Sequence, residues 1–154
     1  MRVTRQQENL VFHLGRREKD LLLDLLQLYP WLPDHHHTLS KGSAIPEQDA
    51  AQHLLEESMA EQCQQNKRQL MALISDSARL KNVGAGWELS LTAPDVEWLL
   101  QVLNDIRVGS WARLGCPEEI MDMAELTPEV TQNLWSMEMC GYFQMHFLKA
   151  FKPG

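Results

Sequence analysis

The sequence lacks the features that mark most small secreted and membrane-spanning chains. Its three cysteines form an odd set without a CxxC spacing, which argues against both a disulfide framework and a structural zinc site. Its longest apolar stretch, LLLDLLQLYPWL, is interrupted by Asp24 and Gln27 and broken by Pro30, and the first ten residues contain no signal-peptide core. We therefore expect a cytoplasmic protein with reduced thiols and no membrane segment.

Basic residues are also scarce. The chain has 14 Lys and Arg residues against 21 Asp and Glu residues, a formal net charge of -7, so a phosphate backbone would meet net repulsion. The one dense basic group, Arg16, Arg17 and Lys19, flanks Glu18 at a predicted helix start, where a solvated first turn explains it. The sequence therefore predicts no nucleic-acid partner.

Linear catalytic motifs are missing as well. There is no HExxH, GxSxG, P-loop or GxGxxG pattern, and we expect no cofactor. One cluster has metal-ligand chemistry: Asp34, His35, His36 and His37. Because consecutive side chains point in different directions in most backbones, we interpret these residues as part of a solvated loop, with metal binding as the alternative.

The patterns that are present predict a single, mainly α domain over residues 1–154. A chain of 154 residues with 44% apolar and 23% charged residues suits one hydrophobic core. Two short runs, residues 9–14 and 87–91, have strand character and lead directly into helical patterns. We expect a compact helical bundle with a small two-stranded β element and an irregular loop at 30–46. The helices are predicted at residues 16–29, from Pro46 to about 82, from Ala93 to about 115, and 128–151.

Two of these helices begin with strong capping signals. Thr92 is followed by Pro94 and Asp95, and Thr127 is followed by Pro128 and Glu129, so each start has a capping hydroxyl, an early proline and an acid near the helix dipole. The helix after Pro46 would span on the order of 50 Å if straight. That length exceeds what a compact domain requires, so this helix either breaks or reaches a partner.

The helix that starts at Ala93 carries an arginine within its apolar stripe. Arg107 points between the directions of Val96 and Leu100, and an unpaired buried charge costs several kcal/mol. Glu56 lies on the apolar face of the preceding helix, so we predict a buried Glu56–Arg107 pair, with an arginine that snorkels at the helix edge as the alternative. Other polar and aromatic neighbours are less certain members of this network. Asn104 and Trp111 share the flank of Arg107, Glu57 borders the apolar face, and Asp105 and Arg113 lie further round.

The same helix carries a family resemblance. The string Leu103-Asn104-Asp105-x-Arg107, followed after five residues by Arg113-Leu114-Gly115 and preceded by Trp98, resembles an uncharacterised family of bacterial domains of unknown function. The resemblance is concentrated between Trp87 and Gly115. It implies a compact helical cytoplasmic protein without an assigned reaction, whose gene often lies beside that of the ClpS protease adaptor.

The helix at 128–151 is apolar on two sides. One stripe contains Val130, Leu134, Met137, Gly141, Met145 and Leu148, and the other side carries Met139, Cys140, Phe143 and Phe147. Either this is the central helix of the bundle, or a second copy of the chain covers one face as a homodimer. Its methionines either fill gaps in the core or form an adaptable binding surface.

These observations favour an interaction or regulatory protein that binds a protein partner or itself. The alternative is a small-molecule enzyme with an acid-base site around Glu56 and Arg107, in which Glu56 and Asp105 supply the base and Arg107 clamps an anion. A pocket lined by these three side chains would favour the enzyme. A dry, fully paired network would favour the interaction protein.

Overall fold

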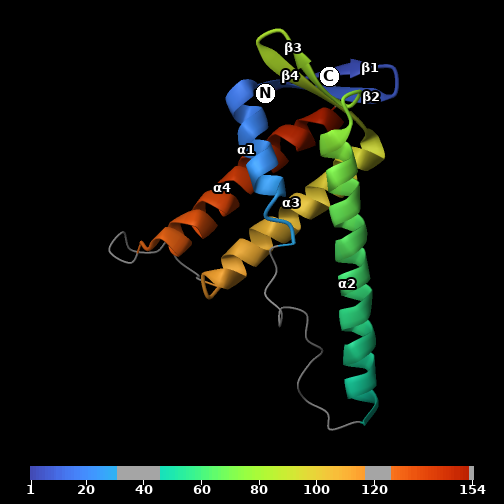
Figure 1. The fold of residues 1–154 in the computed structure, drawn as a ribbon, viewed down its shortest axis with the longest axis vertical. Helices are drawn as coiled ribbons and strands as arrows, with labels where there is room; N and C mark the ends of the chain where they lie inside the picture. Colours follow the sequence, from blue (N-terminus) through green and yellow to red (C-terminus); the bar gives the residue numbers. More distant parts are fainter. Residues whose placement is uncertain (31–45, 117–125, 153–154) are drawn as a thin grey trace.

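The computed structural model describes residues 1–30, 46–116 and 126–152, with only the backbone path given for 46–48 (Figure 1). Its strands form one antiparallel sheet in the order β1-β2-β4-β3, and the helices lie together on one side of it. The strands are β1 (Arg2–Gln6), β2 (Asn9–Gly15), β3 (Leu80–Val83) and β4 (Gly86–Thr92). The helices are α1 (Arg16–Leu26), α2 (Pro46–Ser75), α3 (Ala93–Arg113), α4 (Pro128–Leu148) and the 3₁₀ helix η2 (Lys149–Phe151).

The fold is therefore α+β, and the prediction of an all-α helical bundle with a small two-stranded element is wrong. The two predicted strands are present as β2 and β4, and they pair antiparallel with Phe12 opposite Leu89. The prediction missed the two edge strands. β1 is rich in charged and polar residues and β3 has only four residues, as is common for sheet edges, so neither shows a clear apolar alternation.

The end of α2 also differs from the prediction. The helix stops at Ser75 rather than near residue 82, because Asp76 turns the chain: its carboxylate accepts a hydrogen bond from the Ala78 N–H. The backbone then becomes β3, and Gly84 occupies the turn to β4 with a φ of 61° rather than ending a helix. The Asp76 side chain thus favours a turn at a point where the sequence pattern predicted that the helix would continue.

The predicted capping signals are confirmed. The Thr92 hydroxyl accepts a hydrogen bond from the Asp95 N–H, and the Asp95 carboxylate accepts one from the Thr92 N–H, which completes a capping box. The Thr127 hydroxyl accepts from the Val130 N–H at the start of α4. These contacts set where α3 and α4 begin.

The core lies between the sheet and α1, α3 and α4. Phe12 of β2 meets Phe147 of α4 edge to face, with ring centroids 4.8 Å apart, and Leu99 of α3 is fully buried between these elements. α3 and α4 run side by side for most of their length (Figure 1). Their shared packing leaves one long seam facing outward.

α2 joins this body only through its C-terminal half. Asn66, Leu70 and Leu73 are buried there, whereas the N-terminal half extends well beyond the other helices in Figure 1. We call residues 49–62 the α2 arm. Most side chains of the arm are exposed, including Leu54 at 64%.

Candidate interaction groove

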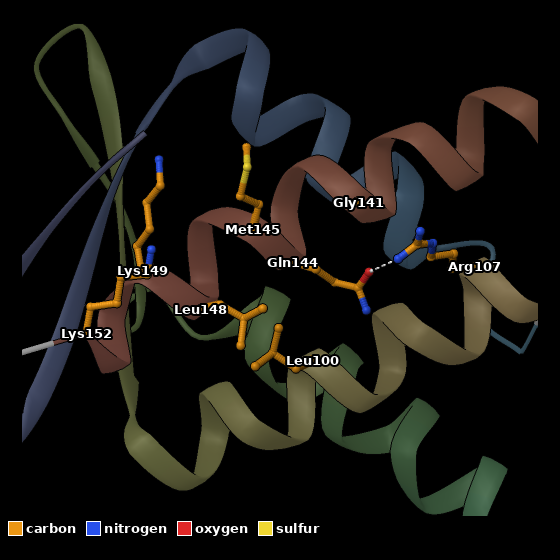
Figure 2. Close-up of a pocket in the computed structure, with 8 residues that line it drawn as sticks. All are labelled: Leu100, Arg107, Gly141, Gln144, Met145, Leu148, Lys149 and Lys152. Carbon is orange, nitrogen blue, oxygen red and sulfur yellow. Dashed lines mark hydrogen bonds between the residues drawn. The ribbon is translucent and has the colours of Figure 1, made fainter.

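The outward seam between α3 and α4 forms a groove of about 600 Å³. Figure 2 shows Leu100 of α3 and Leu148 of α4 pointing toward each other across it, with Arg107 near one end and Lys149 and Lys152 at the other. The full lining is Leu100, Arg107, Gly141, Gln144, Met145, Leu148, Lys149 and Lys152.

The floor of the groove is apolar because α4 is covered by the core on one side only. Cys140, Phe143 and Phe147 are buried against the body, and burial raises the pKa of the Cys140 thiol to about 12. The opposite stripe leaves Met145 and Leu148 each 52% exposed. The two apolar sides predicted for this helix are thus present, but Met145 and Leu148 have no cover within the described chain.

The groove is cationic in a chain of net charge -7. Its eight described lining residues include Arg107, Lys149 and Lys152 but neither Asp nor Glu. Lys149 and Lys152 also border an adjoining hollow of about 430 Å³, to which Arg5 of β1 contributes a further cation. Such a local excess of positive charge beside apolar surface attracts an anionic, partly apolar ligand.

Arg107 lies at the edge of this groove rather than in a buried pair. Its side chain is exposed and donates a hydrogen bond to the Gln144 Oε1 at 3.4 Å (Figure 2), which corresponds to the snorkelling alternative. Glu56 is exposed on the α2 arm and accepts a hydrogen bond from Gln52 at 3.1 Å. The structure therefore does not bring Glu56 and Arg107 together in the interior, and the acid-base site predicted around them does not converge.

The other predicted network residues are also at or near the surface. Glu57 is exposed and pairs with His53, one turn earlier on the arm. Asn104, Trp111 and Arg113 are exposed, and Asp105 is half-buried. Asp34, His35, His36 and His37 lie outside the described residues.

A buried polar network is present, but it lies on the opposite side of α3 and contains different residues. The Asn66 amide, which is 9% exposed, donates to the Tyr29 hydroxyl at 2.9 Å and accepts from the Trp98 indole N–H at 3.0 Å. Lys67 Nζ donates to the Tyr29 carbonyl. Burial raises the pKa of Tyr29 to about 12, although the hydrogen bond from Asn66 opposes this shift. These contacts connect the segment that follows α1 with α2 and α3.

The sequence contains a signal for this network. Asn66 follows Cys63 by three residues and precedes Leu70 by four, so it lies on the apolar face of α2, where a polar side chain requires partners. An amide that can both donate and accept is suited to join a tyrosine and a tryptophan. The prediction of a charged pair involving this face of α2 did not include Asn66.

A second polar contact joins α4 to α1. The Tyr142 hydroxyl donates to the Glu18 carboxylate at 2.7 Å, and Glu18 also accepts from the Gly15 N–H. Burial raises the pKa of Glu18, but these hydrogen bonds outweigh it, so the pKa lies below its usual range. The Glu18 carboxylate therefore has a structural role, because its hydrogen bonds join α1 to α4.

The described residues contain neither a metal-binding cluster nor a membrane-spanning helix. No three His, Cys, Asp or Glu side chains in this part of the chain are grouped so that they could hold a metal ion. None of the described helices combines the length and hydropathy needed to cross a bilayer.

Comparison with protein-family models, with curated proteins and with solved structures yielded no match to this chain. The resemblance to an uncharacterised bacterial family therefore stays a prediction.

Proposed function

We propose that this chain is a protein-interaction module whose α3–α4 groove binds an acidic, amphipathic helical segment. One observation carries the proposal: the groove combines an exposed apolar floor with three cations and no lining carboxylate in an otherwise acidic chain. Burial of Met145 and Leu148 by a partner would provide apolar contact, and the cations would select for negative charge.

The spread of the cations favours a helical segment over a small anion. Gln144, the partner of Arg107, lies in α4, and Lys152 follows η2 eight residues later, so about 13 Å of helix rise separates them. A single carboxylate or phosphate cannot reach both ends of such a site. A helix with carboxylates on successive turns can reach both while its apolar face covers Leu148.

The expected energetics suit a reversible contact. Full burial of a methionine or leucine side chain contributes about 1.5–3 kcal/mol, and about half of each side chain is already covered here. Cations at the rim of an interface mainly increase the rate of association and the specificity. The groove alone is therefore expected to give a regulatory, salt-sensitive interaction.

We place this interaction in the cytoplasm. The three cysteines are free in the structure, including Cys116, which is exposed, and free exposed thiols are typical of reducing compartments. Secretion of the native protein with oxidised cysteines would contradict this assignment.

Photo-cross-linking in the native cell tests the proposal. Met145 is replaced by photoreactive p-benzoylphenylalanine, and the cross-linked products are sequenced by mass spectrometry. We expect one dominant adduct with a protein segment that is acidic and helical. Lys149→Glu together with Lys152→Glu should reduce its yield at least about fivefold, as expected for the loss of roughly 1 kcal/mol.

The matched control places the same photoreactive residue at Asp24, an exposed position of α1 outside the groove lining. The adduct formed at position 145 should be absent there. Adducts only with lipids or small metabolites, or equal capture at both positions, would overturn the proposal.

A further inference from the structure

We infer that the segment bound in the groove is the α2 arm of a second copy of this chain. This inference rests on the proposed function and specifies its partner. The arm has the chemistry that the groove lacks: residues 49–62 contain four carboxylates and neither Lys nor Arg. These carboxylates belong to Asp49, Glu56, Glu57 and Glu61.

The arm presents an acidic and partly apolar face. Leu54, Glu57 and Glu61 follow one another at helical spacings of three and four residues, so they share one side of α2. Leu54 is 64% exposed, and Glu57 is exposed and pairs with His53 at the surface. This side can therefore offer one large apolar group and two carboxylates to another surface.

The spacing of these charges matches that of the groove. Glu57 and Glu61 are separated by about 6 Å of α-helix rise. Lys149 is the first residue of η2 and Lys152 caps its C-terminal end, so their Cα atoms are separated by about 6 Å of 3₁₀-helix rise. Two glutamates one helical turn apart can thus face two lysines at a similar backbone spacing, with Leu54 against the apolar floor.

The arm cannot reach the groove of its own chain. It continues without interruption from the part of α2 that Asn66, Leu70 and Leu73 anchor, and it extends away from the end of α4 in Figure 1. Folding back would require breaking the helix beside the Asn66–Trp98 hydrogen bond. A second molecule supplies an arm without this cost.

A charge exchange between two variants tests the inference by sedimentation velocity on the full chain. The wild type is expected to sediment as a species larger than the 17.8 kDa monomer at tens of micromolar. Glu57→Lys with Glu61→Lys makes the arm face formed by Leu54, Glu57 and Glu61 basic, and Lys149→Glu with Lys152→Glu makes the groove acidic. Each variant alone should be monomeric, because this arm face and the groove then carry charges of the same sign.

Mixing the two variants should restore the larger species, because the basic arm face of one variant then meets the acidic groove of the other, and the acidic arm face of the second meets the basic groove of the first. The matched control, Glu8→Lys with Glu97→Lys, changes the net charge as the arm variant does but at exposed positions outside the arm. It should associate like the wild type. If the control also failed to associate, the loss of association would be caused by net charge and not by the position of the charges on the arm.

A monomeric wild type, or a mixture that fails to recover the larger species, would overturn the inference. If the wild type is monomeric while position 145 still captures an acidic helical segment of another protein, the proposed function holds and only the identity of the partner is wrong. If neither occurs, both fail.

Discussion

The two sides of α3 differ in how their polar side chains are buried and paired. On the side facing α2, the half-buried Trp98 indole N–H donates to Asn66, and Asn66 donates to Tyr29 in the interior. On the other side, Arg107 and Leu100 border an open groove, and Arg107 makes a long hydrogen bond to Gln144 at the surface. Polar groups on the closed side are paired because leaving them unpaired there would be costly. Those on the open side contribute little to folding and stay available to a partner.

The largest stability effect is expected on the closed side. Asn66→Ala removes the partner of the Tyr29 hydroxyl and the Trp98 indole at once, so we expect the free energy of unfolding to fall by about 2–4 kcal/mol. Urea unfolding followed by tryptophan fluorescence measures it. Gln65→Ala, at an exposed neighbouring position, is the control and should change stability by less than about 0.5 kcal/mol. Equal effects would mean that the network does not hold α2.

Loss of the N-terminal cap of α3 should destabilise the protein, because the helix packs against α2 on one side and borders the groove on the other. Thr92→Ala removes the hydroxyl that accepts from the Asp95 N–H, and loss of such a cap typically costs about 1 kcal/mol. Thermal unfolding would report the loss, and Thr92→Ser should recover most of it. A stability unchanged by Thr92→Ala would show that packing alone sets this helix end.

Acid should weaken the same helix start. Burial raises the pKa of Asp95, but hydrogen bonds from Thr92 and the Arg79 charge outweigh it, so the folded-state pKa lies below the ordinary 3.8. The stabilisation is therefore fully present above the ordinary pKa and is lost as the pH falls through the lower folded-state value. Asp95→Asn should consequently lose less stability than the wild type between about pH 5 and pH 3 in urea titrations. Parallel losses in both proteins would assign the acid sensitivity to other carboxylates.

The smallest stability effect is expected in the groove. Leu148→Gln replaces a half-exposed side chain with a polar one, and Arg107→Gln removes a weakly held charge, so each should change the free energy of unfolding by no more than about 0.5 kcal/mol. The same changes should weaken the association measured by sedimentation. A loss of stability as large as that of Asn66→Ala would mean that the groove is part of the core rather than a binding surface.

Local signals in the sequence were sufficient to predict several elements. The Thr92 and Thr127 caps, the strand patterns of β2 and β4, and the helices after them depend on contacts between near neighbours, so a single segment contains the information. The sequence also predicted that α2 is longer than a compact domain requires. The edge strands β1 and β3 were not predicted, although each pairs with the strand that follows it in the sequence, because a polar strand and a four-residue strand show no clear apolar alternation.

The candidate site depended on tertiary structure. The sequence by itself determined that Arg107 shares a helix side with Leu100, that Asn66 lies on the apolar face of α2, and that α4 is apolar on two sides. Only the packing of α3 beside α4 decided that Arg107 borders an open groove and that Met145 and Leu148 stay exposed. Only the docking of α2 against α1 and α3 paired Asn66 with Tyr29 and Trp98. Helical periodicity sets the direction of a side chain on its own helix, whereas its burial and partners depend on which other element occupies that direction.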